Sequence, residues 1–477
     1  MKKKIYTIIG ILIMALSLIF YFKNMKIYKG YIYTEISNDE IMIVRYVGNK
    51  KSIVIPAYIK SKPVTKIKNE CFIESNLESV ELSNTLVEIG DAAFGKNKIK
   101  KLKIPGNVKI IGKCSFIDNK IEKLELEEGL EKIDFAAFAG NKIKKLDLPN
   151  SVKEIKKLAF SSNEMEKLKI GTGLNKIEDS SFIKNKIKEL KIPKNIKIVD
   201  KTSFANNEIE KLELEEGLEE INSVAFADNK IKEIILPNSL KNIKESAFSS
   251  NKIEKLKIGT GLNEIESCAF LNNEIKIINI PKNVKVIGKA GFANNKIEKL
   301  ELEEGIEKIK ESAFADNKIK KLMLPNSVKE IKESAFVKNE IEELKIGTGL
   351  NKIEYGVFLK NNIKRIEIPK NIKVVGEGSF LGNQINTLKL EEGIEEIGDL
   401  AFAENKIKKL NIPNKIKIIG KGSFVNNEIE ILNIEDEVEY IDKAAFTLNK
   451  IKSVTLPKNI EYLDEKAFDK SVQINYK

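Results

Sequence analysis

The chain of 477 residues is 42% hydrophobic and 32% charged, which is typical of a folded protein and excludes a disordered or fibrous one. Its formal net charge is +12, but Arg45 and Arg365 are its only arginines, and it has no histidine. Because arginine is the preferred residue for bidentate phosphate and base contacts, a lysine-biased composition argues against nucleic-acid binding. Without histidine, and with the carboxylates set in repeated exposed slots, no acid–base pair or metal cluster stands apart from the repeated pattern. We therefore predict no catalytic residue, cofactor, metal or small-molecule substrate.

The first segment, residues 1–26, has the pattern of a signal sequence or an N-terminal membrane anchor. Residues 2–4 are lysines, residues 5–22 form an apolar run, and Lys23 and Lys26 follow it. The run has about the minimum length for a spanning helix, and the nearest small-residue cleavage candidate, around Ala15, is followed by further apolar residues. These features favour an uncleaved anchor, with a cleaved signal peptide as the alternative. Either interpretation places the rest of the chain outside the cytoplasm.

A strict repeat follows. Nineteen of the 22 phenylalanines recur every 22 residues, from Phe72 to Phe468, without an insertion or a deletion. A fixed period of about 20 to 50 residues is the signature of a solenoid, in which each repeat forms one coil and stacked coils share a continuous core. We therefore predict one solenoid over residues 67–468, with the phenylalanines stacked as a spine through its interior.

Residues 97–116 show how one coil is built. Leu102 and Ile104 alternate with lysines, which is the period of a strand with one buried face. The strand ends at Pro105, which has no N–H for a sheet ladder, and the chain then returns to the next phenylalanine. This pattern predicts one short parallel strand per 22-residue coil, with a short strand or 3-10 segment on the convex side.

Asparagine occupies one slot of every repeat from Asn97 to Asn449. A buried amide can satisfy backbone groups of its own coil and of the adjacent coil, which removes about 1–3 kcal/mol for each group otherwise left unpaired. A ligand site repeated so often is not credible. We therefore predict a structural asparagine ladder at one corner of the solenoid.

The three cysteines fall in small-residue slots of the repeat. Cys71 lies one place before its phenylalanine, and Cys114 and Cys268 lie two places before theirs. Cys71 and Cys114 are about two coils apart, roughly 10 Å, which is too far for a disulfide. We expect small, buried, unpaired thiols.

The sequence also has a longer period of 88 residues, which equals four coils. Four types of turn follow the strands of successive coils in a fixed cycle. The turns read Glu-Glu-Gly, Pro-Asn-Ser, Gly-Thr-Gly and Pro-Lys-Asn. The packing of 22-residue coils gives no reason for this longer period, so block duplication is the simplest origin and a ligand with a four-coil pitch is the alternative. The Gly-Thr-Gly turns lack the Lys-Ser/Thr pair and the following helix of a phosphate-binding loop.

The repeat pattern N-x-I-x-x-L-x-I-P-x-x-V-x-x-I-x-x-x-A-F resembles the BspA-like, or treponemal, class of bacterial leucine-rich repeats. Its most specific half is present in residues 325–336, PNSVKEIKESAF. The resemblance implies a β-rich, right-handed leucine-rich-repeat solenoid with residues 27–66 as its N-terminal cap, and residues 469–477 look like a short C-terminal cap. The period is one residue shorter than the family's commoner one, and asparagine replaces the usual Gly-Cys before the leucine strand. Both departures change a corner of the coil and not the fold.

The resemblance implies a surface-exposed or secreted protein that binds extracellular-matrix or cell-surface proteins. We therefore expect an extracellular, membrane-anchored, adhesin-like binding scaffold, and a cell-envelope spacer without a specific ligand is the alternative. The outward strand positions form a long face whose charges can pair with one another. Apolar, aromatic or arginine residues that break the charged template are the candidate binding face, and they are Ile235, Ile277, Met323, Tyr355 and Arg365.

Overall fold

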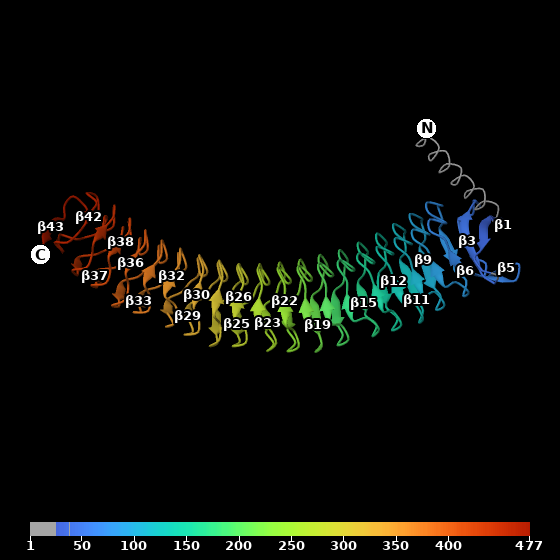
Figure 1. Cartoon of the computed structure of the whole chain (residues 1–477), viewed down its shortest axis with the longest axis horizontal. Helices are drawn as coiled ribbons and strands as arrows, with labels where there is room; N and C mark the ends of the chain where they lie inside the picture. The colour runs from blue at the N-terminus through green and yellow to red at the C-terminus, as the bar shows by residue number, and fades with distance from the viewer. Residues whose placement is uncertain (1–24, 38) are drawn as a thin grey trace, which may run out of the picture. The chain divides into compact units, whose positions relative to one another are not determined.

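The structure is a computed structural model that describes residues 25–37 and 39–477. The chain divides into two compact units, Met1–Ile209 and Glu210–Lys477, which are described one at a time. Both units repeat the same coil, which consists of a long strand of three or four residues, a turn, a two-residue strand and a second turn (Figure 1). The described residues contain no α-helix.

The predicted signal sequence or anchor falls mainly on residues 1–24, which lie outside the described residues. Within the part of the chain that the structure covers, no helix is long and apolar enough to span a membrane. The anchor therefore stays a prediction from the sequence.

The first unit begins with the segment predicted as the N-terminal cap. Its strands are β1 (Lys26–Tyr28), β2 (Tyr31–Glu35), β3 (Ile41–Tyr46), β4 (Ser52–Val54), β5 (Tyr58–Ile59) and β6 (Lys62–Ile67). Strands β1, β2 and β3 pair antiparallel, whereas β3 pairs parallel with β6. Strand β6 in turn pairs parallel with the first two-residue strand of the coils, so the cap and the coils share one sheet.

In the coils of the first unit, long and two-residue strands alternate along the chain. The long strands are β7 (Ser79–Glu81), β9 (Lys101–Ile104), β11 (Lys123–Leu126), β13 (Lys145–Asp147), β15 (Lys167–Lys169) and β17 (Glu189–Ile192). The two-residue strands are β8 (Glu88–Ile89), β10 (Ile110–Ile111), β12 (Lys132–Ile133), β14 (Glu154–Ile155), β16 (Lys176–Ile177) and β18 (Ile198–Val199). The long strands β9 to β17 pair parallel in chain order.

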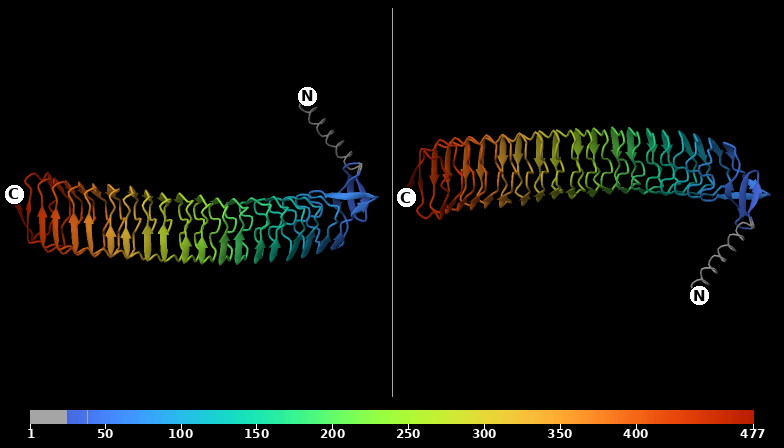
Figure 2. Two further views of the ribbon diagram at one scale, coloured as in Figure 1. Left: turned by 90° about the horizontal axis from the view of Figure 1, so that it is seen from below. Right: turned by 90° about the horizontal axis from the view of Figure 1, so that it is seen from above.

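The second unit continues the same alternation. Its long strands are β19 (Lys211–Leu214), β21 (Glu233–Ile235), β23 (Lys255–Lys257), β25 (Ile277–Ile280), β27 (Lys299–Leu302), β29 (Lys321–Met323), β31 (Glu343–Lys345), β33 (Arg365–Ile368), β35 (Thr387–Leu390), β37 (Lys409–Ile412), β39 (Ile431–Ile434) and β41 (Ser453–Leu456). Its two-residue strands are β20 (Glu220–Ile221), β22 (Asn242–Ile243), β24 (Glu264–Ile265), β26 (Val286–Ile287), β28 (Lys308–Ile309), β30 (Glu330–Ile331), β32 (Lys352–Ile353), β34 (Val374–Val375), β36 (Glu396–Ile397), β38 (Ile418–Ile419), β40 (Tyr440–Ile441) and β42 (Tyr462–Leu463). A final strand, β43 (Gln473–Tyr476), pairs parallel with β41. Within each unit, Figure 2 shows the long strands side by side in chain order from two further directions.

The alternation of each long strand separates a buried face from a solvent face, as the sequence predicts. In β9, Leu102 and Ile104 are buried, whereas Lys101 and Lys103 point to solvent. Parallel pairing in register places Leu124 of the next coil beside Leu102. The same slot of successive coils therefore forms a column along the sheet, and interior columns build the core.

The predicted phenylalanine spine is confirmed in each unit. Neighbouring rings lie 4.8 Å apart between Phe72 and Phe94, and 5.9 Å apart at the wider step between Phe336 and Phe358. Their planes are nearly parallel, at 2° and 13° in these two steps. Stacked aromatic pairs contribute about 0.5–1.5 kcal/mol beyond the burial of their area. The spine is thus a continuous source of coil-to-coil attraction.

Two tyrosines of the cap continue this column at its first end, which the repeat pattern did not predict. The Tyr46 ring lies 5.6 Å from the Phe72 ring, and Tyr31 meets the same phenylalanine edge to face at 6.3 Å. The Tyr31 hydroxyl donates to the carbonyl oxygen of Val54 at 2.9 Å. Burial raises the pKa of Tyr31 to about 12. Tyrosine suits this position because its ring caps the spine while its hydroxyl finds a polar partner.

The predicted asparagine ladder is also confirmed, and each amide joins two coils. Oδ1 of Asn317 accepts the N–H of Ile297 in the preceding coil at 3.0 Å. Its Nδ2 donates to the carbonyl of Phe292 in that coil at 2.9 Å and to the carbonyl of Phe314 in its own coil at 3.2 Å. The amide therefore satisfies backbone groups that the corner would otherwise bury unpaired.

Left-handed backbone conformations bracket each phenylalanine of the spine from Phe72 to Phe446. The residues two places before and two places after Phe94 are Ala92 and Lys96, with φ of 52° and 55°. Cys114 occupies the earlier of these slots in the next coil, with φ of 54°. Glycine, asparagine and aspartate tolerate this region best, although other residue types occupy it here. This conformation also explains why Cys114 is only half-buried, because its side chain lies at the bend and not inside the core.

The four turn types of the 88-residue cycle hydrogen-bond to one another in a fixed order. In the second unit, the Pro-Lys-Asn turn donates the N–H of Lys282 to Glu303 of the following Glu-Glu-Gly turn at 3.1 Å. Glu304 then accepts the N–H groups of Asn326 and Ser327 in the Pro-Asn-Ser turn, each at 3.0 Å. These backbone donors hold the pKa of the Glu304 carboxyl below its usual range.

Two further links complete the cycle. Oδ1 of Asn326 accepts both the N–H and the hydroxyl of Thr348 in the Gly-Thr-Gly turn, at 3.0 and 3.1 Å. Asn371 of the next Pro-Lys-Asn turn donates to the carbonyls of Leu350 and Gly347. The first unit contains the same links. The expectation that coil packing gives no reason for the 88-residue period is therefore wrong, because each turn type carries the group that its neighbour needs.

Replacing Asn317 with alanine should lower the free energy of unfolding by about 3 kcal/mol, since at least two buried backbone groups lose their partner at about 1–3 kcal/mol each. Urea denaturation followed by circular dichroism measures the change. Asn362→Ala is the matched control, because Asn362 is exposed in the same unit and should change stability by less than about 0.5 kcal/mol. Equal effects of the two substitutions would contradict the ladder.

Replacing Ser327 with alanine should destabilise the second unit by about 1–3 kcal/mol. The serine hydroxyl accepts the N–H of Gly305 and donates to the carbonyl of Ile306, both at 2.8 Å. Ser312→Ala is the control, because Ala290 fills the equivalent slot one coil earlier. The urea denaturation midpoints of the two variants are the measurement. An unchanged midpoint for Ser327→Ala would show that the hydrogen bonds between turns do not stabilise the unit.

Candidate functional site

The candidate site is the strand face, which consists of the outward-pointing first and third residues of the long strands in each unit. The inward residues of these strands are apolar and buried or half-buried, so the outward ones are the side chains most available to a partner. Most of them are lysine or glutamate. An apolar side chain in this face is therefore a departure from a repeated template, and its position is set by a rigid sheet.

The structure brings two of the predicted residues, Ile235 and Ile277, to one hollow in the second unit. Ile235 is the third residue of β21 and Ile277 is the first residue of β25, with β23 between them. Their exposed fractions are 58% and 62%. The hollow has a volume of about 440 Å³, and Lys255 and Lys257 of β23 also line it.

Two more predicted residues, Met323 and Arg365, line a second hollow of the same face. Met323 is the third residue of β29 and Arg365 is the first residue of β33. The hollow has a volume of about 870 Å³ and also includes Glu343 and Lys345 of the intervening strand β31. Four of the five predicted residues thus lie on the strand face, two at each hollow.

Tyr355 does not join them. It follows the two-residue strand β32, in the turn that leads to Phe358, and its carbonyl accepts the N–H of Ser334. The prediction that Tyr355 lies among the outward strand residues is wrong, because its slot lies three places before Phe358, after the two-residue strand. Its side chain is 48% exposed, but it belongs to the two-residue-strand side of the coil.

The same strand face contains an apolar residue that the sequence reasoning missed. Ile431 is the first residue of β39 and is exposed. It shares its slot with Ile277, seven coils earlier, so a reading of the first strand position in every repeat would have found it.

A second exposed column lies on the two-residue strands. Ile418, Tyr440 and Tyr462 are paired in register on β38, β40 and β42, and all three are exposed. The hydroxyl of Tyr462 donates to Asp464 at 3.2 Å. Their slot is charged in most earlier coils and apolar at Ile110, Ile198, Val286 and Val374, so the run of three apolar or aromatic residues was a signal available in the sequence.

Opposite charges pair along the strand face of the second unit, as the sequence predicts. Lys321 and Glu343 meet at 2.7 Å across adjacent strands, and Lys389 and Glu367 at 2.9 Å. The ammonium of Lys321 holds the pKa of Glu343 below its usual range. Exposed pairs of this kind contribute little to stability, because solvent screens both charges, so they are chiefly a solvated charge pattern.

The thiols are poorly suited to nucleophilic chemistry. All three cysteines are free, as expected, but only Cys71 is buried, and Cys114 and Cys268 are half-buried. Burial raises the pKa of each thiol above its ordinary value, which lowers the thiolate fraction. In residues 25–37 and 39–477, no three Cys, Asp or Glu side chains are grouped to hold a metal ion. Neither the thiols nor a metal site therefore adds to what the strand face offers a partner, which is apolar contact and charge pairing.

Solved structures of several leucine-rich-repeat proteins are similar to this chain. One from Bacteroides ovatus is 19% identical, covers 95% of this chain and 99% of its own, and has a TM-score of 0.39. The pneumococcal vaccine antigen PcpA is 18% identical, covers 95% of this chain and 98% of its own, and has a TM-score of 0.41. A leucine-rich cell surface protein from Faecalibacterium prausnitzii is 17% identical, with 86% and 94% covered and a TM-score of 0.34. These similarities carry no argument about partners or activity.

No curated protein sequence matches the chain. The sequence pattern of the BspA type leucine-rich repeat region (six copies), however, matches residues 65–188, 175–298, 263–386 and 351–475. These overlapping matches cover the coils of both units. The chain therefore belongs to the family of BspA-type leucine-rich-repeat proteins.

Proposed function

We propose that this protein is an extracellular, membrane-anchored leucine-rich-repeat scaffold that binds proteins of a host or of a neighbouring cell in an adhesin-like way. The observation that carries the binding role is the pair Ile235 and Ile277, which flank one hollow in an otherwise charged strand face. Extended repeat surfaces are commonly used to bind proteins, and family membership makes that use the first expectation here.

The chemistry of this hollow fits a protein partner. Burying an isoleucine side chain contributes about 1.5–3 kcal/mol, so two of them supply the apolar centre of a small interface. Glu233, Glu254 and Lys276 surround the hollow and provide a polar rim of both signs. A partner that presents an apolar side chain among mixed charges would complement this arrangement.

The second hollow extends the same face by several coils. Met323 and Arg365 belong to the residue types that are enriched in protein interfaces, and arginine can pair with a partner's carboxylate in two contacts. Both hollows lie within the second unit, on long strands that pair in order from β21 to β35. A standard interface of about 800 Å² per partner would span several strands of this sheet.

The pattern of residues 1–26 supports the proposed extracellular, membrane-anchored location. A lysine-flanked apolar run supports a location at a membrane, and a repeat domain that follows such a segment would meet extracellular partners. The strand face is then presented to solvent at the cell surface.

Replacing Ile235 with aspartate and Ile277 with glutamate should weaken binding to the cognate protein at least about 30-fold, the effect of losing about 2 kcal/mol at an interface centre. These residues occur in the same slots at Asp147 and Glu189, so the substitutions restore the template and should not unfold the sheet. Binding of the full chain to a panel of extracellular-matrix and cell-surface proteins, measured by biolayer interferometry, is the test.

The matched control carries Ile418→Glu and Ile110→Lys on the two-residue strands, where exposed apolar residues are changed away from the strand face. It should keep the affinity of the unmodified protein. Unchanged binding by the Ile235 and Ile277 variant would reject this site, and no binding by the unmodified protein to any of the panel would favour the spacer alternative.

Fractionation of the native cells tests the location. We expect the protein in the membrane fraction with an intact N-terminus, and its repeats should be lost when protease is added outside intact cells. A shortened chain in the medium would replace the anchor by a cleaved signal peptide. Full protection from external protease would reject the extracellular location.

A further inference from the structure

Four lysines stand in one uninterrupted column on the strand face of the first unit. Lys101, Lys123, Lys145 and Lys167 are the first residues of β9, β11, β13 and β15, and they are paired neighbours in register. All four side chains are exposed. Adjacent strands lie about 4.8 Å apart, so the column is a row of cationic side chains at that interval.

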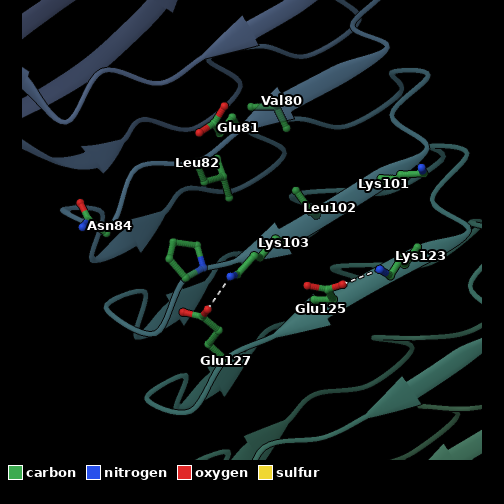
Figure 3. A pocket seen from close by; sticks show the side chains of 11 residues that line it. Val80, Glu81, Leu82, Asn84, Lys101, Leu102, Lys103, Lys123, Glu125 and Glu127 are labelled. Atoms are coloured by element: carbon green, nitrogen blue, oxygen red, sulfur yellow. Dashed lines mark ion pairs between the residues drawn. The ribbon is translucent and has the colours of Figure 1, made fainter.

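Like charges directly opposite one another on a sheet are destabilising, and the neighbouring carboxylates compensate only part of this column. Lys123 pairs with Glu125 at 2.7 Å, and Lys145 pairs with Asp147 at 2.6 Å. Figure 3 shows the first of these pairs beside Lys101, which has no dashed line to a carboxylate. Among the described residues, neither Lys101 nor Lys167 forms an ion pair.

A parallel row of lysines strengthens the positive charge. Lys98, Lys120 and Lys142 lie three places before the strand lysines of the same three coils, and they too are exposed. None of these three forms an ion pair with another described residue. The positive charge of the first unit therefore continues in a second column, three places earlier in the same coils, although the exposed column between them contains Glu122 and Glu166 as well as lysines.

The corresponding column of the second unit differs, because its lysines are interrupted and compensated. Lys255 lies beside Glu233 of the adjacent strand at 3.6 Å, and Lys321 lies beside Glu343 at 2.7 Å. Lys299 pairs within its own strand. The first residues of the long strands thus form a different charge pattern in each unit, and only in the first unit do four lysines follow one another without interruption.

The geometry points to a binding site for a linear sulfated polysaccharide along this column of the first unit. Such a polymer carries anions along its whole length, and a regular row of cations complements a regular row of anions without requiring a deep cavity. The strand face of the first unit contains no arginine and no aromatic residue, the two kinds of side chain that stack on bases, so it is poorly suited to single-stranded nucleic acid. The lysine ammonium is a compact charge that can donate hydrogen bonds to a sulfate in several orientations, so it does not need the planar, two-contact geometry of arginine.

Binding of the full chain to immobilised heparin at 50 to 200 mM salt tests the site. If four ammonium groups displace the counterions of the polymer, log affinity should fall with log salt with a slope of about 3 to 4, by analogy with other linear polyanions. The variant Lys101→Gln, Lys123→Gln, Lys145→Gln, Lys167→Gln should lose most of this slope and bind at least about tenfold more weakly at the lower salt.

The matched control removes the same number of charges from the same strand slot in the second unit. It carries Lys255→Gln, Lys299→Gln, Lys321→Gln and Lys409→Gln, and it should keep the slope of the unmodified protein. Equal loss in both variants would show attraction by net charge alone and would overturn the site. A double variant, Lys101→Gln with Lys167→Gln, should lose about half of the slope, which keeps the test decisive if the fourfold variant is unstable.

Two further probes fix the ligand class. Desulfated heparin should bind much more weakly than heparin, and equal binding would overturn the role of sulfate. Oligothymidylate should bind more weakly than heparin at every salt concentration, and tighter binding would assign the column to nucleic acid instead. The isoleucines at the hollow of the second unit are untouched in all of these variants, so failure here leaves the proposed protein-binding role standing.

Discussion

The buried asparagine amide is the interaction on which the rest of this structure depends. Its oxygen and nitrogen reach backbone groups 20 and 25 residues earlier in the chain, so the amide fixes the length of a coil as well as its corner. An inserted residue would move the amide out of reach and leave the corner unpaired. The absence of insertions between Phe72 and Phe468 follows from this requirement, and the regular columns follow from the constant coil length.

Constant coil length turns sequence slots into physical columns. Phenylalanines in one slot become a stacked spine, and leucines in another become a continuous interior, because parallel strands pair residues that are one repeat apart. The turns add a finer rule, since each turn type supplies a hydrogen-bonding group to the next type. The order of coils within the 88-residue cycle therefore has a structural reason, whatever its origin.

The candidate functional surfaces of this repeated fold lie where a residue differs from the other residues of its column. Ile235 and Ile277 interrupt charged columns with apolar side chains, whereas the lysines from Lys101 to Lys167 interrupt a mixed column with a run of one sign. The fold can tolerate either departure, because outward residues contribute little to the core. Two surfaces of different chemistry can therefore occupy the strand faces of different units of one chain.

The sequence by itself determined the coil length, the buried strand positions, the spine and the ladder, because an apolar or amide residue repeated in nearly every coil serves the packing that all coils share. Tertiary structure decided what lies beside each slot. It placed Tyr355 on the two-residue-strand side, left Cys114 at a left-handed bend and set Tyr31 and Tyr46 over the end of the spine. The 22-residue period of the sequence identifies which residues are equivalent between coils. Which side of the coil each one occupies depends on backbone bends and contacts between coils, and only the folded chain contains these.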